Sequence, residues 1–445
     1  EADGVTRTRW SFAVYLNKVY MCNGVDAYAE YDWTTYTTFW SQPKCRYLRY
    51  MADSIYWAWE DTNPSTVYAT TAWAANGQTL NANDIKVWWD ELWRINWMLD
   101  LWNVILIFKN KKIYITTNII PHNEDLDGLI EYLKALEERH VDAIISASPF
   151  IIDMALKHTK LEVHLSTQQS ATNADAANFW FDYGVKRIVL ARELDKYQIK
   201  KLIPKTNADI EVFIHGGMCM SYSGRCSLSN NMTDRDANRG GCAHSCRWSY
   251  ELTQNGVAVS EQMFSMSSKD LEALEQIPFL IEAGVKSLKI EGRMKSLHYI
   301  ATVVSTYRNL IDTYLDKGEI IDFEPFLIEL QKAENRLTSH GYLEGLPGID
   351  QQLFDKKSEQ PSQLFIGLVK DYDDKTQIAT IEQRNYFEVG YDIEIFHPSG
   401  TEDSFILKEM TDEDGEALDV ARHPKQILKI KVPFHVEPYA MLRRK

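Results

Sequence analysis

The sequence predicts an α/β fold, a (β/α)8 TIM-like barrel followed by a small antiparallel, barrel-like β domain. Three segments, 138–148, 182–193 and 282–293, repeat one pattern in which a helix ends, Gly or His takes a left-handed conformation, and Val opens an apolar strand. Further β-type runs bring the strands before residue 300 to at least six, with amphipathic helical stretches between them. This alternation indicates a parallel sheet covered on both faces, and it favours a closed barrel over an open doubly wound sheet.

The barrel is expected to begin near the N-terminus. A weaker copy of the repeat, NGVDAYAE, occupies residues 23–30, so the barrel is assigned to residues 1–320. All thirteen tryptophans except Trp180 and Trp248 lie in residues 1–110. Neither helix nor strand periodicity explains this density, and no function is assigned to that segment.

The residue pattern changes after residues 297–318, which are predicted to form the last barrel helix. Residues 321–362 are predicted to be a helical and linker segment, and the polar linker DKKSEQPSQ begins at residue 355. Beyond it, short alternating runs such as QIATIEQ, YDIEIFH and ILKIKVP are separated by turn residues, which predicts a small antiparallel β domain over residues 363–445.

Composition limits the partners that the protein can have. The net charge of the 445 residues is -15, so a nucleic acid would have to bind a local basic surface. Residues 421–445 are a candidate, with seven Lys or Arg against the single acid Glu437, although a solvated strand face is the simpler interpretation. There is neither a secretory leader pattern nor a run of about 20 apolar residues, so we expect a cytoplasmic protein without a membrane partner.

Four of the six cysteines lie close together, at Cys219, Cys226, Cys242 and Cys246. Thiols stay reduced in the cytoplasm, so such a group indicates a metal or catalytic site rather than disulfides. The spacing matches neither zinc knuckles nor the ferredoxin run, which leaves an iron–sulfur cluster, structural zinc, and buried or redox thiols as alternatives. Cys219 follows the apolar run IEVFIHGG directly, and the C-terminal ends of barrel strands are where such folds carry their active sites.

Arginines accompany these cysteines, and polar residues follow the predicted strands. Arg225, Arg239 and Arg247 could clamp a carboxylate or phosphate, or could pair with Asp234 and Asp236. The strand-end candidates for the site are Asn118, Thr167, Gln168, His215 and Glu291. Each of them also has a local structural explanation, since strand ends carry polar turn residues for purely local reasons.

Long stretches around the cysteines resemble a known family. FIHGGMCMSYSGRCSLSNNMTDRDANRGGCAHSCRWSYEL, FSMSSKDL and SLKIEGRMKS are similar to the collagenase-like peptidase family of unknown catalytic type, the thirty-second such family, and within it to the bacterial tRNA hydroxylation proteins. The resemblance runs from about Lys112 onward. It implies a barrel with a 4Fe-4S cluster that hydroxylates carbon 5 of the wobble uridine of tRNA without molecular oxygen and takes the hydroxyl group from prephenate.

The resemblance also implies roles for individual residues. Cys219, Cys226 and Cys242 match the cluster ligands of the family, and Cys246 is the natural fourth ligand because no cysteine follows it. Prephenate is a dianion, so the candidates to bind it are the cations Arg225, Arg239, Arg247, Arg293 and Lys295. His215, Glu291 and Arg293 are the candidate catalytic residues, with His215 as a proton shuttle. Tyr222 and Trp248 could stack on an unstacked base, and the basic tail that includes Arg443, Arg444 and Lys445 would dock the tRNA body.

Two other functions fit the same resemblance. The chain could be a collagenase-like peptidase, although it lacks H-E-x-x-H and G-x-S-x-G. It could also be the non-catalytic member of a pair of homologous subunits. Retention of all four cysteines favours an active hydroxylase.

Overall fold

The computed structural model describes residues 111–259, 263–292, 295–333, 336–354 and 365–445, together with the backbone of seven strands between Ser11 and Ala69. The chain divides into two compact units. The first comprises Glu1–Thr116, Pro121–Ile144 and Phe150–Glu162, and the second comprises Thr117–Ile120, Ile145–Pro149 and Val163–Lys445. In the ranges described, no helix combines the length and apolar character that a bilayer crossing requires.

The N-terminal strands of the first unit pair antiparallel. One sheet contains, in chain order, β1 (Ser11–Tyr15), β2 (Lys18–Cys22), β3 (Ala29–Tyr31) and β4 (Tyr36–Thr38), and another contains β5 (Tyr47–Met51), β6 (Ser54–Glu60) and β7 (Asn63–Ala69). Short connections allow antiparallel pairing, whereas a parallel pair needs a longer crossover. Strand β3 includes the last two residues of the segment 23–30, which was expected to form a first parallel barrel strand. It pairs antiparallel with β2 and with β4 instead.

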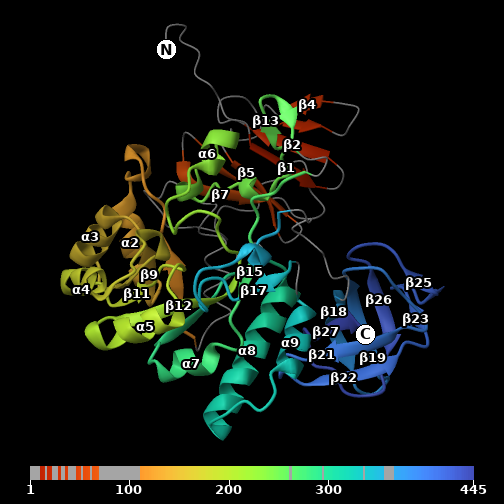
Figure 1. The fold of residues 1–445 in the computed structure, drawn as a ribbon. Helices are drawn as coiled ribbons and strands as arrows, with labels where there is room; N and C mark the ends of the chain where they lie inside the picture. Colours follow the sequence, from red (N-terminus) through yellow and green to blue (C-terminus); the bar gives the residue numbers. More distant parts are fainter. Residues whose placement is uncertain are drawn as a thin grey trace. The chain divides into compact units, whose positions relative to one another are not determined.

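Helix and strand alternate from residue 114 to residue 317. The elements are β8 (Tyr114–Thr116), α2 (Leu129–Glu138), β9 (Ala143–Ser146), α3 (Pro149–His158), β10 (Glu162–Leu165), α4 (Ala174–Tyr183), β11 (Arg187–Val189), α5 (Lys196–Leu202), β12 (Asp209–Gly216), α7 (Ile277–Glu282), β16 (Ser287–Ile290) and α8 (Leu297–Lys317). In the second unit, β11 runs parallel to β10 and β12, and β16 runs parallel to β12. Helices α5, α7 and α8 pack against one another in that order (Figure 1).

The three helix stops that define the sequence repeat have the predicted conformation. They are His140, Gly184 and Gly284, with φ of 57°, 115° and 90°. A residue in the left-handed conformation ends a helix because it turns the chain away from the helix axis. Backbone N–H groups at this turn then bond to the last carbonyl groups of the helix. The valines that follow the first two stops, Val141 and Val185, are buried, as expected for residues that open an apolar strand.

Two short strands join the barrel sheet at the C-terminal end of β12. Strand β15 (Asp270–Glu272) pairs antiparallel with His215 and Gly216, and β17 (Thr338–Ser339) pairs parallel with β15. The chain between β12 and β15 is a long excursion that carries all four clustered cysteines. The fold therefore places the cysteine loop at the carboxyl end of a central strand.

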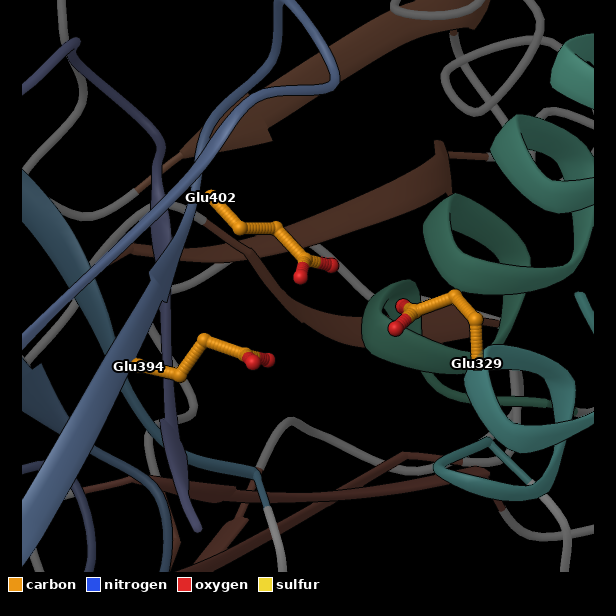
Figure 2. Close-up of side chains that lie close together, drawn as sticks. All are labelled: Glu329, Glu394 and Glu402. Atoms are coloured by element: carbon orange, nitrogen blue, oxygen red, sulfur yellow. The ribbon is translucent and has the colours of Figure 1, made fainter. Parts of the chain in front are cut away.

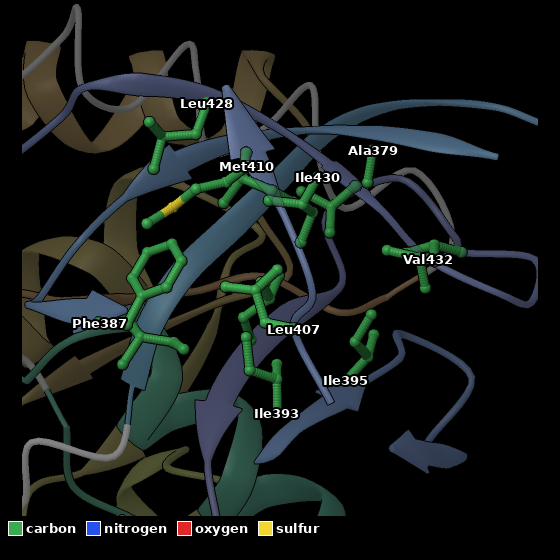
Figure 3. Packing of buried hydrophobic residues seen from close by; sticks show 14 of the residues in the cluster. Ala379, Phe387, Ile393, Ile395, Leu407, Met410, Leu428, Ile430 and Val432 are labelled. Atoms are coloured by element: carbon green, nitrogen blue, oxygen red, sulfur yellow. The ribbon is translucent and has the colours of Figure 1, made fainter. Parts of the chain in front are cut away.

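The residues after 365 form an antiparallel β domain. Its main sheet has the order β22 (Glu402–Ile406), β21 (Asp392–Phe396), β27 (Met441–Arg444), β18 (Phe365–Asp373), β19 (Ile378–Gln383), β26 (Ile427–Lys431), β23 (Met410–Thr411) and β24 (Ala417–Leu418). Figure 3 shows its core, where Phe387, Ile393, Ile395 and Leu407 are fully buried. Each such side chain contributes about 1.5–3 kcal/mol through burial. The predicted fold class, a TIM-like α/β barrel followed by a small antiparallel β domain, is confirmed.

A buried ion network joins this domain to helices α8 and α9 (Glu324–Gln331). The carboxylates of Glu329, Glu394 and Glu402 converge (Figure 2), and the cations Lys332 and Arg443 lie among them. Arg443 Nη1 is 2.6 Å from Glu329 and 3.1 Å from Glu394, and only 1% of its side chain is exposed. The expectation that the basic tail docks tRNA is therefore wrong for Arg443, because β27 is a central strand and turns this residue into the protein.

His298, on the first turn of α8, is predicted to make stability depend on pH. It is buried, stacks on Phe365 and accepts a hydrogen bond of 2.8 Å from Arg443 Nε. Burial, and then the charge of Arg443, lower its pKa from 6.5 to about 3, against the opposing charge of Glu394. Below pH 6.5 the unfolded chain binds a proton that the folded chain does not, so this contribution to stability is present above pH 6.5 and declines by up to about 1.4 kcal/mol per pH unit as the pH falls towards 3.

The measurement compares the free energy of unfolding of the original chain and of His298→Asn between pH 7.5 and 4.5. We expect the advantage of histidine over asparagine to shrink as the pH decreases. The exposed His423→Asn serves as control and should show no such trend. A difference between His298→Asn and the original chain that stays constant across this range would contradict the prediction.

Candidate active site

The four clustered cysteines occupy one loop of the second unit. Cys219 lies just past β12, Cys226 precedes helix α6 (Leu228–Thr233), and Cys242 and Cys246 follow that helix. All four are free thiols. Burial raises the pKa of Cys219, a backbone hydrogen bond from Ser221 opposes this, and the three other thiols raise it further. All four belong to the one excursion of the chain between β12 and β15.

Backbone contacts fix this loop onto the ends of the barrel strands. Gly224 has φ of 71°, and a Cβ there would lie 2.0 Å from the carbonyl oxygen of Gln168, so only glycine fits. The Ser223 amide donates to Glu193 over 2.8 Å, and the Ser223 hydroxyl donates to the same carboxylate. Near the third cysteine, the amide of Ala243 donates to Ser229 Oγ over 3.0 Å. These anchors are independent of the thiols.

A buried acid beside the loop gathers three cations. Asp270, the first residue of β15, is 3.2 Å from Arg336 Nη1 and 3.8 Å from both Arg247 Nη2 and Lys295 Nζ. Burial raises the pKa of Asp270, while the charges of Arg247 and Lys295 work against that rise. Three positive groups around one carboxylate leave a local excess of positive charge, and the buried Arg247 Nη1 makes no hydrogen bond. An anion bound here would supply the missing acceptor.

A second ion pair lies at neighbouring strand ends. Glu291, directly after β16, accepts a hydrogen bond of 2.5 Å from Arg192 Nη2, and Arg192 also bonds the carbonyl oxygen of Gly217. The Arg192 guanidinium packs 3.9 Å from the centre of the Phe213 ring. Glu291 and Arg192 both contribute to the electrostatic environment of Asp270. The acid and the cations thus form one charged group that the cysteine loop joins through Arg247.

Sequence reasoning missed four members of this arrangement, which are Arg192, Glu193, Asp270 and Arg336. The signal for the first two was present in the repeat. When the repeat segments 182–193 and 282–293 are aligned on Val185 and Val285, Arg192 and Glu193 fall at the end of the strand. Glu291 lies at the corresponding strand end of the second segment. Asp270 lies in the quoted motif FSMSSKDL, whereas no pattern marks Arg336.

The other predicted residues fall in different environments. Arg225 and Tyr222 are exposed on the loop, and Trp248 is exposed as well. Arg239 and Asn118 are half-buried, and the segment of Asn118 meets the loop through a bond from Ile120 N to the Asn238 carbonyl. Arg293 lies outside the described residues.

Three further candidates have local partners. Thr167 Oγ1 donates to the Leu190 carbonyl over 3.0 Å, and the side chain of Gln168 accepts from Ser166. His215 is buried against Tyr299 and Tyr307, with Nδ1 3.3 Å from the Tyr307 hydroxyl. Burial, and then the charge of Lys295, lower its pKa to about 3, so the ring is neutral at physiological pH. Its observed contacts are those of a core residue, and its role as a proton shuttle stays a prediction.

Known proteins match this chain over most of its length. A model of peptidase family U32 matches residues 105–353, and a model of the C-terminal domain of that family matches residues 361–443. The tRNA hydroxylation protein P1 of Bacillus subtilis is 48% identical over 342 residues, which cover 75% of this chain and 81% of that protein. The tRNA hydroxylation protein P of Escherichia coli is 31% identical over 386 residues, with 75% and 84% covered.

A protein named for a different activity is also similar. The collagenase of Porphyromonas gingivalis is 34% identical over 231 residues, which cover 48% of this chain and 55% of that protein. The match to the U32 model spans more than half of the chain and includes the cysteine loop, Asp270 and Glu291. The chain therefore belongs to peptidase family U32.

Proposed function

We propose that this chain is a cytoplasmic tRNA hydroxylase that adds a hydroxyl group to carbon 5 of the wobble uridine. The reaction uses no molecular oxygen, and prephenate is the source of the hydroxyl group. Cys219, Cys226, Cys242 and Cys246 hold a 4Fe-4S cluster. The observation that carries the proposal is the position of four free thiols in one loop at the carboxyl end of a central strand, beside an excess of positive charge. The names of the relatives support tRNA as the substrate.

The donor set suits an iron–sulfur cluster better than a single zinc ion. Four sulfurs around one zinc lie about 3.8 Å apart, because each bond is about 2.3 Å and the geometry is tetrahedral. Among the described residues, Glu329, Glu394 and Glu402 have three ligand atoms within 4.8 Å of one another, and the thiols are not such a group. Wider spacing fits a cluster in which each cysteine binds a different iron. When bound, the cluster supplies one-electron chemistry.

The cations around Asp270 would bind and orient the hydroxyl donor. Prephenate carries two carboxylates, and Arg247 and Lys295 face the same buried acid from different segments. An arginine can bind a carboxylate through two parallel hydrogen bonds, and Arg247 Nη1 is buried without a partner. The net exchange balances, since the uridine C–H becomes C–OH while the donor C–OH becomes C–H. The base is oxidised by two electrons and the donor is reduced by two.

The exposed residues of the loop would contact the RNA. Tyr222 and Trp248 present aromatic surface to solvent, and the exposed Arg225 lies close to Tyr222 in the sequence. Enzymes that modify a base inside folded RNA act on an unstacked nucleotide, which aromatic side chains stabilise by stacking. This arrangement would hold an anticodon loop over the thiols.

An oxygen-labelling assay tests the proposed function. Chain purified without oxygen is incubated with tRNA that lacks the modification and with prephenate whose hydroxyl oxygen carries a heavy isotope. Mass spectrometry of the nucleosides should show 5-hydroxyuridine that contains the heavy oxygen. Product formed equally well without prephenate, or product that contains only light oxygen, would contradict the proposal.

The same preparation separates the alternative functions. Cleavage of gelatin by chain freed of iron would favour the peptidase that the name of the collagenase relative suggests. Hydroxylation only after addition of a homologous second subunit would identify this chain as the partner of an active enzyme. Hydroxylation by the isolated chain excludes that role.

A further inference from the structure

A pocket of about 400 Å³ adjoins the first cysteine of the loop. Its lining includes Met218, Cys219, Met220, Phe264, Met266, Tyr342, Gln351 and Phe354. This volume lies in the range of about 300–1,000 Å³ that is usual for small-molecule sites. The charged group around Asp270 is not part of this lining.

The walls suit a flat, uncharged ligand. Phe264 and Phe354 stack with their ring centres 5.6 Å apart and their planes 13° from parallel. Three methionines complete the apolar surface, and thioethers make favourable contacts with aromatic rings. The segment that carries Phe354 is held in place, because Ser265 N donates to its carbonyl over 2.9 Å and Lys269 N donates to that of Gln351 over 3.1 Å.

Among the described lining residues, Gln351 has a side-chain oxygen, Oε1, that is buried and makes no hydrogen bond. A buried acceptor without a donor is destabilising, and a hydrogen bond from a ligand would remove that cost. An amide accepts one hydrogen bond and donates another, which matches the adjacent N–H and C=O of a uracil edge.

We propose that this pocket binds the unstacked uracil, with the ring against the Phe264–Phe354 pair and its edge on the Gln351 amide. The inference rests on the proposed function and names the residues that read the target base. Among the described residues that line the pocket, Lys269 is the one Lys or Arg, so the pocket itself disfavours a dianion, and prephenate binds the Arg247–Lys295 side instead. Lys269 can pair with the phosphate of the flipped nucleotide.

A binding measurement without turnover tests the pocket. Fluorescence anisotropy compares an anticodon stem-loop that carries uridine at the wobble position with the same RNA that lacks that base, in the absence of prephenate. The uridine RNA should bind more tightly by about 5- to 100-fold, the range that stacking of one base provides. Phe354→Leu and Gln351→Leu should each reduce this ratio towards one, because each removes one of the two proposed contacts to the base.

Matched controls come from elsewhere in the second unit. Gln426 in the β domain also has a buried amide oxygen without a partner, so Gln426→Leu controls for the amide. Phe179 is 62% exposed on α4, so Phe179→Leu controls for the ring. Both controls should keep the ratio of the original chain. Two pocket variants are used in case the Gln351 variant folds poorly. Phe354 is partly exposed, so its replacement should leave the fold intact.

The outcomes of the two assays can be told apart. A base-dependent affinity that falls in both pocket variants supports the pocket, even if the labelling assay finds no hydroxylation. Labelled product together with a ratio of one, or with pocket variants that bind like the original chain, overturns the pocket and leaves the proposed function intact. Pocket variants that raise the KM for prephenate and leave RNA affinity unchanged also overturn it.

Discussion

Serine in place of Cys226 or Cys242 is expected to remove the iron and acid-labile sulfide from chain purified without oxygen. Hydroxylation of tRNA should fall by at least about 100-fold, the upper end of what loss of a single supporting group costs at a metal site. The physical reason is that a cluster needs thiolate ligands, which a serine hydroxyl cannot replace at neutral pH. Iron and sulfide analysis, the visible absorption spectrum and the nucleoside assay measure the effect.

The variants should keep the fold of the loop. Its anchors are the amide of Ser223, the hydroxyl of Ser229 and the carbonyl of Cys226 itself, which accepts from Asn238 Nδ2 over 3.3 Å. None of these bonds uses a sulfur atom. Cys22→Ser, outside the loop, is the control and should retain iron and activity. Full iron content in both loop variants would show that these thiols do not share one centre.

Much of the fold follows from local sequence. Helix stops such as His140 and Gly184 need a left-handed residue, and the valines after them begin strands whose side chains are buried. Period-two alternation in the last part of the chain predicts antiparallel strands in the same way. Helix stops and strands can be predicted from the sequence because their cause, a backbone conformation or an apolar face, depends on neighbouring residues in the chain.

The site was predictable only in part, because contacts between distant segments leave no local pattern. Arg247 and Lys295 were expected to bind anions together, and the structure brings both to Asp270. Arg336 and Gln351 reach the site from a segment without a recognisable motif. Arg443 is the opposite case, since its basic neighbours suggested an exposed surface and only the central position of β27 explains its burial.

Arg443→Ala is expected to lower the free energy of unfolding by about 3–5 kcal/mol, the usual loss when one partner of a buried ion network is removed. The guanidinium contacts Glu329, Glu394 and Glu402, donates to Thr302 over 2.6 Å and to His298, and packs 4.1 Å from the centre of the Phe396 ring. Without it, the nearly buried Glu394 keeps Lys332 as its cation. Urea or thermal unfolding measures the loss.

The exposed Lys445→Ala is the control, and its bond to Ser404 should contribute less than about 1 kcal/mol. If Arg443 instead served RNA binding, its replacement would weaken tRNA affinity and leave unfolding unchanged, which would contradict the structural role. The double variant Arg443→Met with Glu394→Leu sharpens the argument. Each single variant removes one partner of the Arg443–Glu394 pair and leaves the other buried, whereas the double variant removes both charges. The double variant should therefore lose less stability than the two single variants lose in sum. Additive losses would mean that the two residues do not interact and that burial of Arg443 alone, rather than the network, holds the β domain to α8 and α9.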